Sequence, residues 1–226
     1  MARVLVLGGS ALTEDAVRAL AGAGHEVSVY WSRGPLAGLP KATSLRSGLA
    51  EADLLVDTTH PFDDILPGLA VALAPRCPRV RFGRPAWVAA PEDKWTIVGT
   101  LAEAVAALPS GARVFAASGR DSAEVLTHHD GPVFLRQLHR HDDPPPPGCT
   151  YVFGDGPFEV ADETALFQEL RIDALLARNM GGVRGFPKLA AARALGLPAV
   201  LIAPPATGFD TQVESADAVL AWVDTA

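Results

Sequence analysis

Short runs of aliphatic residues alternate with amphipathic segments along the chain. The run from Arg3 to Leu7 ends at Gly8-Gly9, and the apolar residues between positions 11 and 22 then recur at helical spacing. Similar strand-like runs follow, most of them separated by an amphipathic or alanine-rich segment. Strands joined in this way by helices are typical of a parallel sheet. The later strands are expected at residues 26–31, 54–56, 80–82, 95–98, 114–117, 133–135, 174–176 and 199–202.

The turn Pro109-Ser110-Gly111 divides this pattern into two halves of similar size. The alternation of strands and helices begins again after it, with helices expected at residues 65–73 and 101–108 before the turn and at 189–195 after it. The sequence therefore predicts an α/β protein with two domains, residues 1–110 and residues 111–226.

A polar segment from His128 to Pro147 departs from this pattern, with four of the six histidines and four consecutive prolines. We expect it to be a rigid surface loop. Its histidines, together with Asp142 and Asp143, form a candidate metal cluster, but side chains in a proline-rich loop rarely converge on one ion, so no metal site is predicted. The histidines concerned are His128, His129, His139 and His141.

Composition and charge exclude several classes of protein. With 226 residues, of which 49% are hydrophobic, the chain is neither disordered nor collagen-like. The formal net charge of −7 argues against binding to nucleic acid or an anionic membrane. The two cysteines are too few for a disulfide scaffold, and no apolar run approaches the roughly 18 residues of a membrane span. A cytoplasmic protein is expected.

Candidate cofactor residues follow the first three strands, where ligands bind in open parallel sheets. Gly8-Gly9-Ser10 would let a phosphate approach backbone N–H groups, although the full G-x-G-x-x-G spacing is absent. Ser32 and Arg33 stand where an NAD site usually has an acidic residue, and an arginine there suits the 2′-phosphate of NADP. Thr59-His60-Pro61 would lie beside the glycine loop. A tight turn, a solvated arginine and a structural histidine are the alternative interpretations.

Cationic side chains gather at the expected loop positions of the second half. Such a cluster would supply the local positive field that an acidic chain otherwise lacks, and it makes a polyanionic ligand plausible. Each cation taken alone is better explained as a solvated surface charge. These residues are Arg84, Arg120, Arg136, Arg178, Arg184 and Lys188.

Several short motifs follow one another along the chain, the most specific being Asn179-Met180-Gly181-Gly182. The others are Gly8-Gly9-Ser10, Thr59-His60-Pro61-Phe62, Arg84-Pro85-Ala86-Trp87 followed by Trp95, Gly156-Pro157-Phe158 with Glu163, Lys188-Leu189-Ala190-Ala191-Ala192-Arg193, and Leu195-Gly196-Leu197-Pro198. Taken in this order, the motifs resemble the precorrin-6A reductase family over almost the whole chain.

The resemblance implies two Rossmann-like three-layer domains with mainly parallel sheets, the first for NADPH and the second contributing to a tetrapyrrole site. It implies reduction of one double bond of precorrin-6A to give precorrin-6B during cobalamin biosynthesis, with possible transfer contacts to neighbouring pathway enzymes. The implied cofactor residues are Gly8, Gly9, Ser10, Ser32, Arg33, Thr59, His60 and Pro61. The implied substrate residues are Arg120, Arg136, Asn179, Gly181, Gly182 and Lys188. Solvent, His60 or Lys188 would supply the proton, so His60 and Lys188 are the catalytic candidates.

The chain departs from the family pattern at three places. Met180 stands where the family usually has serine, and Ala203-Pro204-Pro205 lacks the usual arginine. Arg46-Ser47-Gly48 runs almost directly into Ala52-Asp53, so the crossover between the second and third strands is expected to be unusually short and without the usual helix. Two other functions stay open: an NADP-dependent reductase of another substrate, and a carrier that binds a tetrapyrrole or dinucleotide without turnover.

Overall fold

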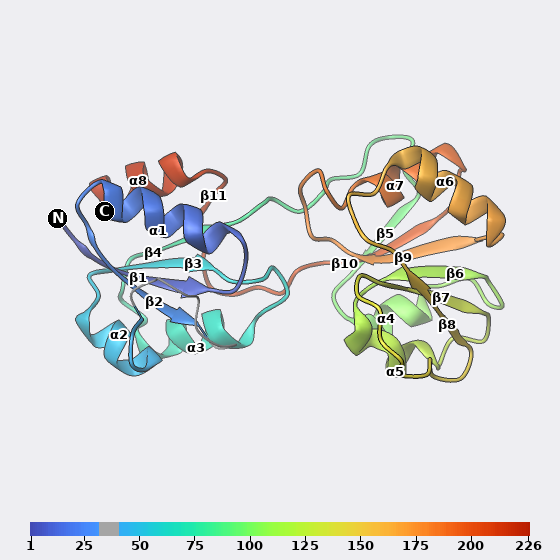
Figure 1. Cartoon of the computed structure of the whole chain (residues 1–226), viewed down its shortest axis with the longest axis horizontal. Coiled ribbons are helices and arrows are strands. Elements are labelled where there is room, and N and C mark those ends of the chain that lie inside the picture. Colours follow the sequence, from blue (N-terminus) through green and yellow to red (C-terminus); the bar gives the residue numbers. More distant parts are fainter. Residues whose placement is uncertain (32–40) are drawn as a thin grey trace. The chain divides into compact units, whose positions relative to one another are not determined.

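Two parallel sheets organise the structure, a computed structural model that describes residues 1–31 and 41–226 (Figure 1). One unit comprises Met1–Pro85 and Pro205–Ala226, and the other comprises Ala86–Pro204. The boundary expected after residue 110 therefore lies inside the second unit. The reason is long-range strand pairing, because β5 (Trp95–Val98) lies beside β10 (Ala199–Ile202) while the chain end returns to the first unit.

The first unit is a five-stranded sheet in the order β11-β4-β3-β1-β2. Its pairings are all parallel. Helices α1 and α8 cover one face, and α2 and α3 cover the other (Figure 1). The bounds are β1 Arg3–Gly8, α1 Leu12–Gly22, β2 Glu26–Trp31, α2 Leu45–Glu51, β3 Leu54–Thr58, α3 Ile65–Leu73, β4 Arg79–Phe82, β11 Gln212–Val213 and α8 Ala216–Thr225.

The second unit is a six-stranded sheet in the order β5-β10-β9-β6-β7-β8, again with parallel pairings. Helices α6 and α7 cover one face, and α4 and α5 cover the other (Figure 1). The further bounds are α4 Leu101–Ala106, β6 Val114–Ala117, a 3-10 turn at Arg120–Ser122, α5 Ala123–Leu126, β7 Val133–Gln137, β8 Cys149–Phe153, α6 Val160–Glu169, β9 Ala174–Arg178 and α7 Pro187–Ala194. The prediction of two Rossmann-like three-layer α/β domains is confirmed.

Each sheet has one point where the direction of its connections reverses. In the first unit the chain passes from β1 to β2 on one side and then crosses to β3 on the other. In the second unit β6 occupies the same position, with β7 on one side and β9 on the other. A crevice outside the carboxyl ends of the strands is expected at such a point, so the loops after β1, β3, β6 and β9 are the places to look for ligands.

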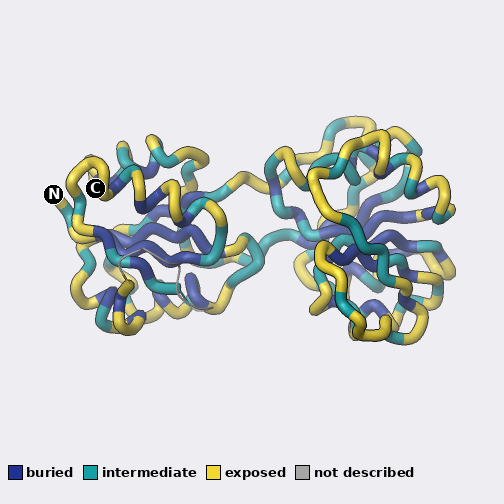
Figure 2. Tube along the Cα trace, in the orientation of Figure 1, coloured by how far each residue is buried: buried dark blue, intermediate teal, exposed yellow. Residues whose placement is uncertain are grey.

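The aliphatic runs form the buried strands, as Figure 2 shows for both sheets. All the expected strands are present, but the pattern missed β8, β11, α2, α5, α6 and α8. Helix α6 buries only Glu163 and Phe167, so it lacks the apolar stripe by which an amphipathic helix is usually found. No helix in the described part of the chain is long and apolar enough to cross a membrane.

Two expectations about connecting segments are wrong. The crossover between β2 and β3 contains the helix α2, which begins with a capping box between Ser44 and Ser47 and buries Leu45 and Leu49. A Cβ on Gly48, in the middle of this helix, would lie 2.9 Å from Leu5 Cδ1. Glycine at this position therefore lets the helix pack closely on the sheet. The histidine-rich segment is likewise not a single surface loop, because it contains the buried strand β7.

Gly131→Ala is expected to lower the free energy of unfolding by about 1–3 kcal/mol, since overpacking forces the backbone apart. A Cβ at this position would lie 2.2 Å from the carbonyl oxygen of Ala112. The matched control in the same unit is Gly99→Ala, whose Cβ would meet only the Glu103 carboxylate at 3.4 Å and should change stability by less than about 0.5 kcal/mol. Urea unfolding compares the two variants, and equal stabilities would contradict the close backbone approach.

Candidate functional site

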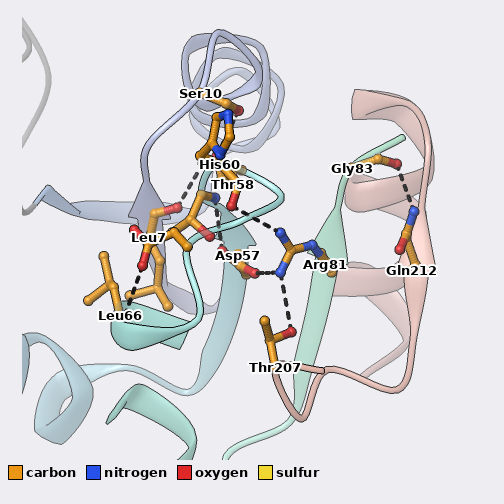
Figure 3. A network of polar contacts seen from close by, with 12 residues as sticks. Leu7, Ser10, Asp57, Thr58, His60, Leu66, Arg81, Gly83, Thr207 and Gln212 are labelled. Carbon is orange, nitrogen blue, oxygen red and sulfur yellow. Dashed lines mark hydrogen bonds and ion pairs between the residues drawn. The ribbon is translucent and has the colours of Figure 1, made fainter. Parts of the chain in front are cut away.

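The glycine loop after β1 and the loop after β3 are joined by hydrogen bonds at the carboxyl edge of the first sheet (Figure 3). Ser10 Oγ donates to the carbonyl oxygen of Thr58 at 2.7 Å. The Thr58 hydroxyl in turn donates to the carbonyl of Leu7 at 2.8 Å and lies 2.8 Å from the hydroxyl of Thr13. The structure thus brings together two loops that are nearly fifty residues apart in sequence.

Gly9 is required by this contact between the loops. A Cβ on Gly9 would lie 2.9 Å from Thr59 Cα and 3.1 Å from the backbone nitrogen of His60. Neither atom can move without shifting the loop after β3. The glycine therefore serves the close packing of the two loops, which is the tight-turn interpretation, and it also keeps backbone uncovered where a ligand would approach.

A buried ion pair holds the loop after β3 from below (Figure 3). Asp57 is a fully buried residue near the carboxyl end of β3. Its carboxylate lies 2.7 Å from the guanidinium of Arg81 on β4. The same carboxylate accepts the backbone N–H of Thr59 at 2.9 Å. Arg81 also donates to the hydroxyl of Thr207 at 3.2 Å, which ties the segment before β11 to this network. Burial raises the pKa of Asp57, while Arg81 and the Thr59 N–H favour its charged form.

The described residues of this edge include groups that fit a nucleotide cofactor. Thr59 Oγ1 is buried and has no hydrogen-bond partner among the described residues. Ala11, the residue before α1, makes no side-chain cap, although Ser10 Oγ accepts the backbone N–H of Leu12 at 3.3 Å, and α1 follows the glycine loop directly. Glu14 and Asp15 in that turn oppose a phosphate, so the site needs a cation as well. Arg33 is the cation expected from the sequence, and it lies with Ser32 outside the described residues.

His60 and Pro61 form an exposed turn after Thr59. The Nδ1 atom of His60 accepts the backbone N–H of Phe62 at 3.2 Å, and the carbonyl of His60 accepts the N–H of Asp63 at 2.8 Å. The imidazole ring is exposed at the carboxyl edge of the sheet. Its position is therefore compatible with contact to a ligand bound beside the glycine loop.

In the second unit, two hydrogen bonds of the Asn179 side chain join its loop to the backbone of Trp87. The Asn179 side-chain amide donates to the backbone carbonyl of Trp87 at 3.0 Å and accepts the Trp87 N–H at 2.7 Å. The Trp87 indole donates to the carbonyl of Gly182 at 2.8 Å. Gly181 and Gly182 both have positive φ, which favours glycine. These hydrogen bonds hold the motif at Trp87 against the motif at Asn179, although the two are far apart in sequence. They also leave the Asn179 side chain buried rather than facing a ligand.

Arg136 belongs to the interior of the second unit, although the sequence suggests a surface cation. Its side chain is only 7% exposed, and its guanidinium lies 3.0 Å from the carboxylate of Glu163 on α6. The guanidinium also stacks over the rings of Phe158 at 4.2 Å and Phe115 at 5.0 Å. Burial raises the pKa of Glu163, and Arg136 opposes that rise. Little of the arginine is available to a ligand.

Lys188 is the second residue of α7 and lies beside this ion pair. Its ammonium donates to the carbonyl of Gly185 and lies 5.3 Å from the ring centre of Trp87. Burial lowers the pKa of Lys188 to about 8, with Arg136 acting in the same direction and Glu163 against it. A lysine whose pKa lies this close to neutral can exchange a proton at the pH of a cell.

Two further expected cations of the second unit, Arg120 and Arg178, pair with exposed aspartates, while Arg84 belongs to the first unit. Arg120 pairs with Asp143, and Arg178 lies 2.5 Å from the carboxylate of Asp121. Gly119 has a φ of 91° and packs against Arg178, so the loop after β6 contacts the end of β9. Arg120 and Arg178 therefore lie at the carboxyl ends of the neighbouring strands β6 and β9.

The histidine-rich segment contributes to structure. The His129 ring is buried, and its Nε2 lies 2.8 Å from the carbonyl of Ala112. His141 packs its ring against Tyr151 and Phe153. Among residues 1–31 and 41–226, no three histidine, cysteine or acidic side chains come together to hold a metal.

Sequence reasoning missed the two buried ion pairs, Asp57 with Arg81 and Arg136 with Glu163. Asp57 was visible only as the polar end of an aliphatic strand, and Glu163 only as part of a motif. Neither position shows its partner in the sequence, because each partner lies on another element. No sequence pattern indicates that Thr207 belongs to the network around Asp57.

Comparisons with known proteins cover the chain from end to end. The family model described as precorrin-6x reductase CbiJ/CobK matches residues 3–224. A precorrin-6A reductase of Rhodococcus erythropolis is 36% identical, with 100% of this chain and 98% of the relative covered. One of Rhodobacter capsulatus is 34% identical, covering 99% and 96%. A solved structure, CobK precorrin-6A reductase, is 32% identical and superposes with a TM-score of 0.78 over 100% of this chain and 97% of that one.

Arg81→Met is expected to cost about 3–5 kcal/mol of unfolding free energy, because it leaves the Asp57 carboxylate buried without a counter-charge. Arg3→Met is the matched control in the same unit. It breaks an ion pair with Asp53 of the same 2.7 Å length, but both of those side chains are about half exposed, so the loss should stay below about 1 kcal/mol.

Urea unfolding of both variants measures these losses. The Arg81→Met loss should shrink as the pH falls, since protonation of Asp57 removes the buried charge and the folded state then binds the extra proton. The double variant Asp57→Asn with Arg81→Met should recover part of the stability for the same reason. Equal small losses in Arg3→Met and Arg81→Met would contradict the role of the buried pair.

Proposed function

The chain belongs to the precorrin-6x reductase family, oxidoreductases of cobalamin biosynthesis, and from this premise we propose that it reduces one double bond of precorrin-6A with NADPH to give precorrin-6B. The observation that carries the proposal is the full-length match together with the position of the family motifs. Three of those motifs lie in the loops after β1, β3 and β9, and Lys188 lies in the first turn of the helix α7 that follows. Loops at the reversal points of parallel sheets are the usual ligand sites of such folds.

The first unit supplies the cofactor site. When bound, NADPH provides the hydride. The hydroxyl of Thr59, which has no hydrogen-bond partner among the described residues, and the first turn of α1 support a site for its polar groups, and Arg33 would meet the 2′-phosphate. The Asp57–Arg81 pair holds Thr59 in place from beneath. The complete set of proposed cofactor residues is Gly8, Gly9, Ser10, Ser32, Arg33, Thr59, His60 and Pro61.

The second unit supplies contacts for the tetrapyrrole. Such a ring combines flat apolar faces with carboxylate side chains, and it needs both apolar and cationic partners. Val88 and Val183 are 87% and 86% exposed. They directly follow Trp87 and Gly182, which are joined by the indole hydrogen bond of Trp87. Arg120 and Lys188 are the proposed cationic contacts. Asn179, Gly181, Gly182 and Arg136 act indirectly, by shaping the loop and the charge cluster beneath it.

Lys188 is the proposed proton donor. Reduction of a conjugated imine leaves charge on a ring nitrogen, and a nearby acid with a pKa close to the working pH neutralises it most efficiently. The pKa of about 8 gives Lys188 this property while it is still mainly protonated at neutral pH. His60 and solvent are the alternative donors.

The cofactor proposal predicts that Arg33→Ala raises the KM for NADPH by about 10-fold or more while leaving the KM for NADH nearly unchanged. The physical reason is loss of a charge-assisted hydrogen bond of about 1.5–3 kcal/mol to the 2′-phosphate. The measurement is oxidation of NADPH and of NADH by the purified protein with precorrin-6A, followed by absorbance.

The same assay tests the proposed function. Turnover of precorrin-6A by the unmodified protein supports it, and a parallel reaction with the cobalt-containing ring identifies the preferred substrate. Oxidation of NADPH only with other acceptors would favour a reductase of another substrate. Ring binding without oxidation of either cofactor would favour a carrier. Equal loss with both cofactors in Arg33→Ala would remove Arg33 from the 2′-phosphate site.

Lys188→Arg is expected to lower kcat by about 10²–10⁴-fold, because arginine keeps the positive charge but does not release a proton. For the unmodified enzyme, kcat should fall as the pH rises through about 8, where Lys188 loses its proton. That decline should disappear in the variant. Lys94→Arg is the matched control, since Lys94 also donates to a backbone carbonyl but is exposed, and its kcat should be unchanged. An unchanged pH profile in Lys188→Arg would assign the proton to His60 or solvent.

A further inference from the structure

The ring of Trp87 is held in a defined orientation. The backbone N–H and carbonyl of Trp87 form two hydrogen bonds with the Asn179 side chain, and the indole N–H donates to the carbonyl of Gly182 at 2.8 Å. Phe186 packs against the indole with the two ring centres 6.1 Å apart, and the indole also contacts the core of the second unit. The backbone and the ring of Trp87 are therefore both fixed beside the loop that follows β9.

The ammonium of Lys188 lies over this fixed ring. Its nitrogen is 5.3 Å from the ring centre of Trp87, within the roughly 6 Å over which an aromatic face attracts a cation. The same ammonium donates to the carbonyl of Gly185. A Cβ on Gly185 would lie 3.0 Å from the Trp87 ring and 3.4 Å from Lys188 Nζ. Glycine at this position thus leaves the ring and the ammonium free to contact each other.

These two contacts hold the ammonium without neutralising it. Lys188 stands in the first turn of α7, where the positive end of the helix dipole disfavours a cation, so its charge needs favourable contacts. The indole ring and the Gly185 carbonyl supply such contacts, and neither carries a net charge. Arg120 and Arg178, in contrast, are held by aspartates that a ligand carboxylate would have to replace.

We propose that Trp87 is a positioning residue for Lys188: its fixed indole ring and the Gly185 carbonyl hold the ammonium in one place and leave its charge uncompensated. This arrangement gives a role to the motif Arg84-Pro85-Ala86-Trp87, whose last residue packs against the start of α7. The placement of the ammonium is a property of the protein without ligand. Its part in turnover rests on the proposed function, in which Lys188 is the proton donor.

Two substitutions of Trp87 isolate the aromatic ring. Trp87→Phe keeps an aromatic face, and Trp87→Leu keeps apolar volume without one. Both lose the indole hydrogen bond to Gly182, so a difference between them reports the ring alone. Trp95→Leu is the matched control, because Trp95 packs against the same core of the second unit and should leave Lys188 unchanged.

Gly185→Ala tests the same contact with every side chain of the pair intact. The added Cβ would meet the Trp87 ring at 3.0 Å, so the ring and the ammonium must separate. This variant keeps the proposal testable if Trp87→Leu does not fold. Gly99→Ala is its control, since a Cβ there would meet only the Glu103 carboxylate.

Lysine-selective ¹³C labelling and NMR measure the contact without any ligand. Lys41 and Lys94 are the other lysines of the chain, and Lys188→Arg assigns the signal of Lys188. Protons held over an aromatic face resonate upfield, so the ε-methylene protons of Lys188 should lie upfield of those of the other two lysines. This displacement should persist in part in Trp87→Phe, shrink in Gly185→Ala and vanish in Trp87→Leu. The pKa of Lys188 should be about half a unit lower in Trp87→Leu than in Trp87→Phe, because the aromatic face favours the charged form.

Three results overturn the inference: no upfield displacement in the unmodified protein, equal spectra of Lys188 in Trp87→Phe and Trp87→Leu, or the same loss in Trp95→Leu. Kinetics with NADPH and precorrin-6A then separate it from the proposed function. In Trp87→Leu, kcat should fall by on the order of 10-fold with an unchanged KM for NADPH, and Trp87→Phe should recover part of it. If the NMR changes occur and kcat stays unchanged, Trp87 positions Lys188 but Lys188 is not the proton donor.

Discussion

Parallel pairing of every strand is the constraint on which the candidate site depends. It places all the carboxyl ends of a sheet at one edge, and the loops that leave this edge are the ones free to carry polar groups. The central strands β1, β6, β9 and β10 are almost wholly buried, so their ends are fixed with little freedom. Loops distant in sequence, such as those at Ser10 and Thr58, therefore meet in a defined geometry.

Among the described residues, each unit carries one ion pair whose two side chains are both largely buried, near the carboxyl edge of its sheet. Asp57 and Arg81 lie on neighbouring strands of the first sheet, whereas Arg136 and Glu163 join a strand to a helix in the second. Buried ion pairs are poor stabilisers, because apolar residues of similar volume often do as well. Asp57 also accepts the N–H of Thr59, so the energetic cost of the first pair is consistent with the organisation of a ligand-binding loop.

The sequence predicted the elements that local patterns determine. Aliphatic runs marked the buried strands, and Gly8-Gly9 and Asn179 marked the two reversal points. The unit boundary was not predictable in this way, because the pairing of β5 with β10 joins segments about a hundred residues apart. Helix α6 was missed because its buried face carries Glu163. Helix α2 was missed because the crossover was expected to be too short for a helix, whereas Gly48 lets a short helix pack closely on the sheet. In these places a tertiary contact overrode the local signal.

Under the proposed function, the cations of the second unit would bind the carboxylates of the substrate. Arg120 and Arg178 are already paired with the exposed carboxylates of Asp143 and Asp121, and Arg136 is paired with Glu163 inside the unit. An exposed ion pair contributes little stability, so a ligand carboxylate can replace the aspartate at small cost. Exchange at Arg136 would instead leave Glu163 buried and unpaired, which is far more costly. The same residue type therefore has two roles in one unit, exchangeable contact at the surface and fixed geometry beneath it.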